Sequence, residues 1–293
     1  MDVKSWVIVL LIVLASSVYV VISQKSKIEQ FQQPDFVSDE YMLRIIEKSP
    51  FFKRMNDRDL QARGTFSSSS YMKSYASSLR PFTSDEKAEL GELVDLVDQR
   101  LGMGAKRIKA IPWKFAKVTR DIERGWPHTL GDVIVLSPEF FKSTDEYSKA
   151  ETLLHEKFHV YQREFPELTE KLVVNSWNYM RVTELPSAID KMQRNNPDIE
   201  GNYSLYGYVV LQVYNNPRPS TIAASQPMKY NASAKDPITT LSSDLSFLPF
   251  PTYIHQLEHP YEIMAVMGAH LLMSGNPTHE TETRFLSWSY EYL

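Results

Sequence analysis

The stretch STDEYSKAETLLHEKFHVYQR, residues 143–163, decides the fold. Ser143 and Glu146 have the spacing of a capping box, in which each side chain bonds the backbone N–H of the other residue. This spacing predicts a helix that runs to about Arg163 and ends before Pro166, because proline disfavours helical geometry in the residue before it. Apolar side chains give the helix a buried setting: Leu153, Leu154, Phe158 and Val160.

The same helix carries a pair of histidines. His155 and His159 are four residues apart, so their imidazoles project from one face, one turn apart. Two nitrogens placed in this way can bind one metal ion. Glu156 stands beside the first histidine, where its carboxylate can take a proton from a water molecule at the metal. Together these residues form the H-E-x-x-H pattern of zinc hydrolases.

Composition restricts the kind of metal site. The chain has 293 residues and no cysteine, which excludes disulfides, cysteine zinc ligands and a cysteine nucleophile. Any transition metal must therefore be held by His, Asp and Glu. Hydrophobic residues make up 43% of the chain, enough for a sizeable core. The net charge of −4 gives no reason to expect a nucleic-acid partner, and none is predicted.

The flanking sequence predicts a mixed architecture. Short alternating runs between 106 and 136, broken by proline and glycine, are typical of strands, and the last of them is 132–136. Thr83 and Glu86 form another capping box, which opens a helix that stops near residue 102. The stretch 196–253 is rich in Pro, Asn, Ser and Tyr and contains one strand-like segment, 206–214. Residues 261–273 form a compact apolar helix after a proline.

The motif resembles that of the zincin metallopeptidases, and among them the gluzincin-like branch, whose third zinc ligand is a glutamate from a later helix. The resemblance covers His155, Glu156 and His159 residue for residue. It implies a catalytic Zn²⁺ that serves the hydrolysis of peptide bonds. The sequence departs from the family at Lys157, where uncharged residues are preferred. This departure leaves coordination intact but weakens the expectation of ordinary peptidase activity.

Glu262 is our choice for the third zinc ligand. It lies in the first turn of the predicted late helix, and the small and apolar residues after it let that helix pack against the active-site helix. Its His-Pro-x-Glu-x-x-Ala setting is also similar to motifs in metallopeptidase-like proteins, some of them encoded by large DNA viruses. Glu184 competes, because many gluzincins take their glutamate at its shorter distance from the second histidine. His255 and His259 also stay open as ligands.

A zinc hydrolase also needs a hydrogen-bond donor for the oxyanion that develops in the transition state. The sequence does not single out one residue for this role. The candidates are Tyr261, His255, His270, Tyr206 and Tyr208.

The amino-terminal region reads as a membrane segment. Residues 6–22 (WVIVLLIVLASSVYVVI) carry no charge and, at about 1.5 Å per residue, just reach across a hydrocarbon core of about 30 Å with their neighbours. We predict a retained transmembrane helix, with a cleaved signal peptide as the alternative. Lys25 and Lys27 favour a cytoplasmic domain, whereas the glycosylation triplets at 202–204 and 231–233 would be usable only outside the cytosol. We therefore predict a single-pass membrane protein of open orientation.

The sequence thus predicts three regions: a transmembrane anchor over 1–23, a stalk and juxtamembrane helical region over 24–80, and a zincin-like metallopeptidase domain over 81–293. The expected fold is α+β, with a small sheet beside the active-site helix and a mainly helical second lobe that supplies Glu262. The predicted function is zinc-dependent hydrolysis of a peptide or protein substrate at a membrane, with Glu156 as general base. The alternative is a catalytically weak or inactive zincin-scaffold membrane protein with a structural or interaction role, for instance in a virion or organelle membrane.

Overall fold

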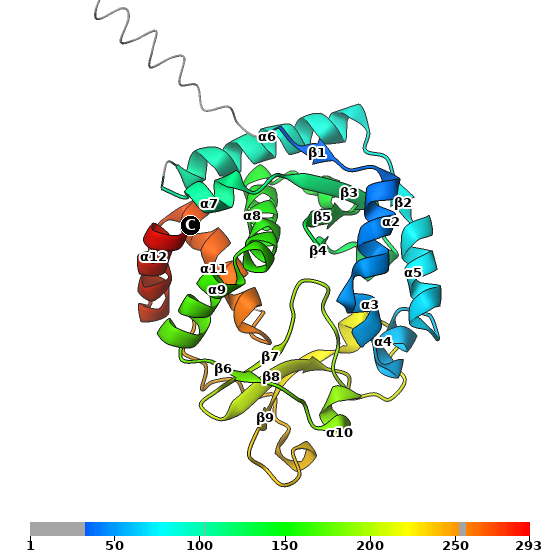
Figure 1. Cartoon of the computed structure of the whole chain (residues 1–293), viewed down its shortest axis with the longest axis vertical. Helices are drawn as coiled ribbons and strands as arrows, with labels where there is room; N and C mark the ends of the chain where they lie inside the picture. Colours follow the sequence, from blue (N-terminus) through cyan, green and yellow to red (C-terminus); the bar gives the residue numbers. More distant parts are fainter. Residues whose placement is uncertain (1–32, 103, 252–255) are drawn as a thin grey trace, which may run out of the picture. The chain divides into compact units, whose positions relative to one another are not determined.

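The computed structural model describes residues 33–102, 104–251 and 256–293 (Figure 1). These residues form an α+β fold with two separate β-sheets. The described residues belong to one compact unit, 33–293. Its helices are α2 (Asp39–Lys48), α3 (Pro50–Arg54), α4 (Asp57–Ala62), α5 (Ser68–Ser77), α6 (Ser84–Leu101), α7 (Lys106–Ala110), α8 (Glu146–Glu164), α9 (Pro166–Glu170), α10 (Ser187–Asp190), α11 (Pro260–Ser274) and α12 (Glu280–Tyr292).

The first sheet has five short strands: β1 (Asp35–Phe36), β2 (Leu79–Arg80), β3 (Lys114–Val118), β4 (His128–Leu130) and β5 (Val133–Leu136). β3 is central: it pairs in parallel with β1 and β5 and antiparallel with β2. β4 returns antiparallel to β5 through a turn at Gly131, whose φ of 62° suits glycine. The predicted strand at 132–136 is therefore confirmed as β5. It lies next to α8, the helix that carries His155 and His159, since β4 and β5 both contact α8.

The helix predicted around His155 and His159 is confirmed as α8, although its cap differs. The N-cap is Asp145, whose side chain accepts from the backbone N–H of Ser148, so the predicted capping box at Ser143 does not form. α8 packs against α6 and most extensively against α11. A Cβ at Gly268 of α11 would lie 2.5 Å from the ring of Phe158, so only glycine allows the two helices to approach this closely.

The second sheet corrects the predicted fold class. It consists of β6 (Met180–Val182), β7 (Asn202–Leu205), β8 (Tyr208–Val213) and β9 (Gln226–Asn231), in that order and all antiparallel. The expectation of a mainly helical second lobe is therefore wrong. β7 and β8 form a hairpin through Tyr206 and Gly207, both with positive φ. The strand-like segment 206–214 is confirmed as β8, whereas its more polar partners β7 and β9 were not predicted.

The fold class needs a second correction. In the part of the chain that the structure describes, no helix is long and apolar enough to cross a membrane. The predicted anchor at 6–22, on which the single-pass localisation depended, falls outside the described residues.

Residues 33–80, which fall in the predicted stalk and juxtamembrane helical region over 24–80, are part of the same compact unit as the rest of the described chain. β1 and β2 belong to the first sheet, and α2 and α3 bury Met42, Ile46, Phe51 and Phe52 in a hydrophobic cluster with β3 and β5. Within this region the serine-rich stretch 67–70 starts a helix, with Ser67 as the N-cap of α5. These polar residues cap a helix because their hydroxyls accept from free backbone N–H groups.

Candidate metal centre

Helices α8 and α11 bring three predicted ligands together. The Nε2 atoms of His155 and His159 are 3.1 Å apart. The Oε2 atom of Glu262, in the first turn of α11, lies 3.4 Å from Nε2 of His155 and 3.3 Å from Nε2 of His159. Of the candidates for a third ligand, Glu262 is therefore the one that the fold places beside the two histidines.

The distances among these three atoms fit a single zinc ion. Ligand atoms about 2.0–2.2 Å from one tetrahedral ion lie roughly 3.3–3.5 Å from each other. The three observed separations, 3.1, 3.3 and 3.4 Å, are close to this range. Oε2 of Glu262 is also buried without a hydrogen-bond partner, and a buried oxygen of this kind is costly unless a cation or a donor satisfies it. The donor set and its spacing therefore suit zinc.

Gln162 sets the protonation of His159. The side-chain N–H of Gln162 donates to the carbonyl oxygen of Tyr261 at 2.8 Å, so its amide oxygen must face Nδ1 of His159, 2.9 Å away. That oxygen can only accept, and Nδ1 must therefore carry the proton. The neutral ring then presents the lone pair of Nε2 toward Glu262, which is the tautomer a metal ligand requires.

Asn196 holds the carboxylate of Glu262 from the other side. Its side-chain N–H donates to Oε1 of Glu262 at 2.5 Å, and its own oxygen accepts from the backbone N–H of Asp198 at 3.0 Å. Oε1 is thus occupied, while Oε2 has no hydrogen-bond partner and could bind a metal ion. The sequence did not identify Asn196, because a polar residue in a Pro- and Asn-rich loop carries no periodic signal.

Replacing Asn196 by alanine is expected to weaken zinc binding by about 10- to 100-fold, the usual effect of losing a group that orients a metal ligand. Competition against a zinc chelator measures this change. Asn216→Ala, in an exposed loop, is the control and should bind zinc as the wild type does. Equal affinities for Asn196→Ala and wild type would show that Asn196 does not orient Glu262.

The charges in the site favour a cation. Burial alone would raise the pKa of Glu262, but the two histidines beside it hold that pKa well below its usual range. Burial alone would lower the pKa of His159, but the carboxylate of Glu262 raises it overall. Glu262 is therefore ionised and acts as an acceptor toward the point where the three ligand atoms converge.

Glu156 is only 3% exposed and is placed to exchange protons. Burial raises the pKa of its carboxyl well above the usual value, and the negative charges of Asp198 and Glu262 add to the effect. Oε2 of Glu156 has no hydrogen-bond partner. A carboxylate with a raised pKa and a free oxygen is a stronger base than an exposed glutamate.

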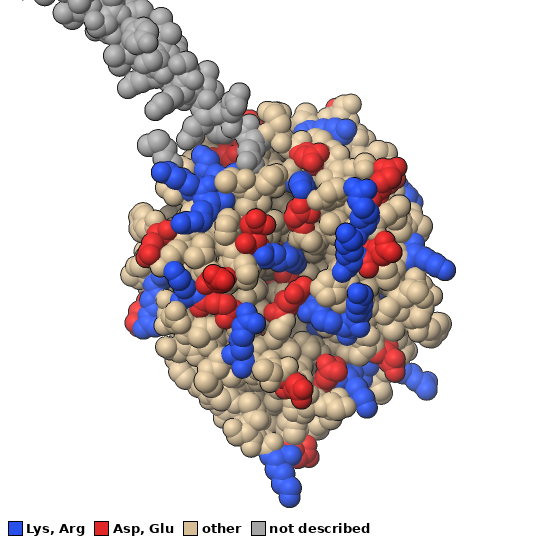
Figure 2. Space-filling view, in the orientation of Figure 1, with Lys and Arg blue, Asp and Glu red and all other residues tan. Residues whose placement is uncertain are grey.

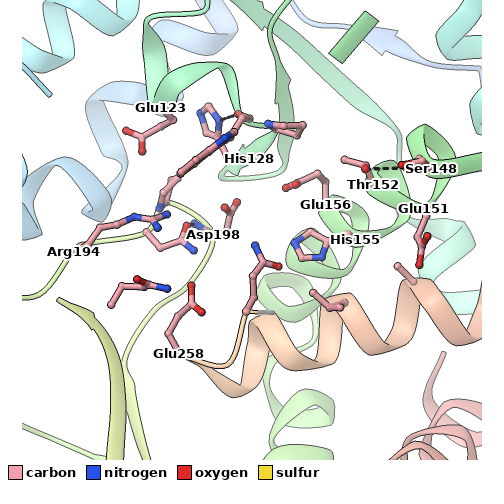
Figure 3. Close-up of a pocket in the computed structure, with 18 residues that line it drawn as sticks. Glu123, His128, Ser148, Glu151, Thr152, His155, Glu156, Arg194, Asp198 and Glu258 are labelled. Carbon is pink, nitrogen blue, oxygen red and sulfur yellow. Dashed lines mark hydrogen bonds between the residues drawn. The ribbon is translucent and has the colours of Figure 1, made fainter. Parts of the chain in front are cut away.

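His155 and Glu156 line a cavity of about 510 Å³. Figure 3 shows His155 and Glu156 on α8 facing this space, with Arg194, Asp198 and Glu258 on the opposite side. The loop 194–198 thus supplies cavity residues that the sequence did not identify. The face of the molecule in Figure 2 carries basic and acidic side chains interspersed.

A second group of possible ligands, Glu156, His159 and Asp198, shares one histidine with the first. One oxygen of Asp198 already accepts from both the backbone N–H and the hydroxyl of Thr129. The group formed by His155, His159 and Glu262 keeps its three ligand atoms available, so it is the better candidate for a metal site.

The chain matches no protein-family model, no curated protein and no solved structure. Two imidazoles and a carboxylate that converge on one point, beside a buried glutamate and an open cavity, are suited to metal-assisted hydrolysis.

The other ligand candidates lie elsewhere. Glu184 is exposed and belongs to neither group of possible ligands. His259 caps α11, its Nδ1 accepting from the backbone N–H of Tyr261, and burial lowers its pKa to about 3. His255 falls outside the described residues.

The remaining candidates for an oxyanion donor do not line the cavity: Tyr261, His270, Tyr206 and Tyr208. The hydroxyl of Tyr261 donates instead to Glu170, 2.9 Å away. His270 lies 3.2 Å from a carboxylate oxygen of Glu151, and Tyr206 is exposed at the hairpin turn. The oxyanion donor is therefore not among these four residues in the described arrangement.

Lys157, the departure from the family pattern, lies on the far side of α8 from the three candidate ligands. Its buried Nζ donates to the carbonyl oxygen of Ile111 at 2.8 Å and lies 3.7 Å from the centre of the Trp113 ring. Burial lowers its pKa to about 7. Lys157 is thus a packing residue of the α8 core face, and its charge does not face the ligands.

Because of this position, Lys157→Met is expected to keep about one zinc per chain. Methionine has a similar length and can fill the same apolar space beside Trp113. Elemental analysis of the purified variant measures the zinc content. Loss of zinc from a variant whose circular dichroism is unchanged would show that Lys157 contributes to the metal site.

Helix α4 and its neighbours hold the loop that carries Asn196. The carboxylate of Asp59 accepts from the backbone and side-chain N–H groups of Asn195, while Arg63 donates to the carbonyl oxygen of Asn195. Arg63 also pairs with Glu123 and Asp59. Since Asn195 directly precedes Asn196, the amino-terminal helices help to position the support of Glu262.

Proposed function

We propose that this protein is a zinc-dependent metallopeptidase of the zincin type, with a gluzincin-like ligand set. The observation that carries the proposal is the convergence of His155, His159 and Glu262, whose ligand atoms are 3.1–3.4 Å apart. Glu156 at the same cavity supplies the base that hydrolysis needs. The proposal also draws on the resemblance of the H-E-x-x-H motif to that of zincins.

In this proposal, Nε2 of His155, Nε2 of His159 and Oε2 of Glu262 hold zinc. When bound, zinc supplies a Lewis acid that polarises the scissile carbonyl and makes a neighbouring water more acidic. Glu156 accepts the proton of the attacking water and returns it to the leaving amine. Gln162 and Asn196 keep His159 and Glu262 in the orientation that binding requires.

The catalytic assignment of Glu156 agrees with its surroundings. Its carboxyl group must be ionised to accept a proton, yet basic enough to hold that proton until the amine leaves. Burial and the nearby carboxylates raise the pKa of Glu156, while Arg163 acts in the opposite direction and limits the rise. A general base works best when its pKa lies near the working pH.

The test is cleavage of a quenched-fluorescence peptide library by the purified full chain. We expect about one zinc per chain and hydrolysis that is lost on chelation and restored by added zinc. Bound zinc should also raise the melting temperature, because a ligand that binds only the folded state stabilises it by about 2.7 kcal/mol at 100 times its Kd. A chain that binds zinc but cleaves no member of the library would contradict peptidase function and favour the inactive-scaffold alternative.

A further inference from the structure

Arg194 is a cation on the wall of an acidic cavity. Of the described residues that line this cavity, it alone is an arginine or lysine, and five others are carboxylic acids: Glu123, Glu151, Glu156, Asp198 and Glu258. Its backbone is fixed, because its N–H donates to the carbonyl oxygen of Gln212 in β8 at 2.8 Å. The residue before it, Gln193, forms a β-bridge with Val213. Arg194 thus starts from a rigid point on the second sheet.

The guanidinium of Arg194 has no hydrogen-bond partner among the described residues. Its Nε is buried without an acceptor, and no described carboxylate lies within the 4.0 Å of an ion pair. Glu258 attracts it only from a greater distance. The side chain is held over the ring of Trp126, 5.6 Å from the ring centre. Packing therefore positions this charge, while its donors stay unused.

The other arginines near the site behave differently. Arg63 donates to Glu123, Asp59 and Asn195. Arg163 donates to the hydroxyl of Thr129 and to the carbonyl oxygens of Gly131 and Pro197. Both guanidinium groups use their donors on protein acceptors, as buried charges usually do. Arg194 is the exception, and its free donors face a cavity.

The acids around Arg194 are already engaged or out of reach. Glu123 accepts from Arg63 and from the hydroxyl of Tyr71. Asp198 accepts from Thr129. A guanidinium presents parallel N–H groups that match the two oxygens of a carboxylate. An anion of this shape that enters the cavity would match the donors of Arg194.

We propose that Arg194 binds a carboxylate group of the substrate and so selects acidic peptides or peptides with a free carboxyl terminus. This inference rests on the proposed peptidase function. In Figure 3, Arg194 extends into the pocket from the side opposite His155 and Glu156. A substrate whose carboxylate is bound by Arg194 would span the cavity and bring a peptide bond toward the metal centre.

Three peptides that share one cleaved sequence test the proposal. One has neutral side chains and a free carboxyl terminus, one has a glutamate and an amidated terminus, and one is neutral and amidated. The full chain should cleave at least one of the two carboxylate peptides more efficiently than the neutral amidated peptide. Comparison of the first two peptides shows whether the carboxylate comes from the chain terminus or from a glutamate side chain. Arg194→Gln should lower kcat/KM for the preferred peptide by about 10- to 100-fold, mainly through KM, and leave the neutral amidated peptide unchanged.

Two further variants sharpen the comparison. Arg194→Lys keeps the charge but not the paired donors, so it should lose less than the glutamine variant. Arg124→Gln is the matched control, since Arg124 also lies over Trp126, at 5.5 Å, but is exposed and does not line the cavity. An equal loss for all three peptides in Arg194→Gln, or no loss for any, would overturn the proposal.

Binding measurements separate this inference from the proposed function. Calorimetry on the zinc-loaded Glu156→Gln chain reports peptide affinity without turnover. If the carboxylate peptides bind more tightly than the neutral one and Arg194→Gln removes the difference, Arg194 binds carboxylate even if the wild type hydrolyses nothing. If the wild type cleaves peptides but Arg194→Gln leaves this difference intact, the inference fails and the peptidase function stands.

Discussion

Replacing Glu156 by glutamine is expected to lower peptide hydrolysis by about 10²- to 10⁴-fold while about one zinc stays bound per chain. Glutamine has nearly the same shape, but its amide cannot accept a proton from water. The three atoms that converge on the metal belong to His155, His159 and Glu262, so the loss of the Glu156 charge leaves the ligand set complete.

Steady-state kinetics and elemental analysis on the same preparation measure both parts of this prediction. Glu164→Gln is a suitable control because Glu164 is the exposed last residue of α8, the helix that carries Glu156. It should keep wild-type zinc content and rate. Wild-type hydrolysis by Glu156→Gln would exclude Glu156 as the base, and loss of zinc from that variant would place Glu156 among the ligands.

Glu262→Gln should weaken zinc binding by more than about 100-fold. The loss of a hydrogen bond that only orients a ligand costs up to about 100-fold, and the loss of the ligand itself should cost more. This change removes the only carboxylate that faces both histidines within ion-pair distance among the described residues. The neutral amide is a much weaker ligand for zinc. The substitution also removes a negative charge that compensates the positive charge of the metal ion.

Chelator competition gives the zinc affinity of Glu262→Gln, and Glu184→Gln is the matched control. Glu184 was the rival third ligand in the sequence, and it is exposed and outside both groups of possible ligands. Its variant should bind zinc as tightly as the wild type. The opposite pattern, with affinity lost in Glu184→Gln and kept in Glu262→Gln, would require a different ligand arrangement.

The active-site helix could be predicted because its signal is local. Apolar spacing and a histidine pair one turn apart need no knowledge of distant contacts, and α8 spans nearly the predicted residues. Glu262 was selected for a similar reason, since Pro260 starts α11 and the following residues are small and apolar. The packing that joins the two helices depends on Gly268 against Phe158, which the sequence alone did not show.

The rest of the site depends on long-range pairing. Asn196 and Arg194 lie in a loop whose sequence is typical of a surface turn, and only its contacts with α4 and β8 bring them to the cavity. The second sheet was missed because β6 and β7 are short and lack a long alternating pattern. Residues 33–80 were predicted as part of a stalk and juxtamembrane helical region, because a local pattern does not show that their apolar positions pack on the first sheet.

A crystal structure of the full chain with zinc, using anomalous scattering at the zinc edge, tests the central claim most directly. The account predicts one zinc ion about 2.0–2.2 Å from Nε2 of His155, Nε2 of His159 and Oε2 of Glu262. The absence of zinc from this position would contradict it. So would a zinc ion held by Glu156, His159 and Asp198, the other group of possible ligands.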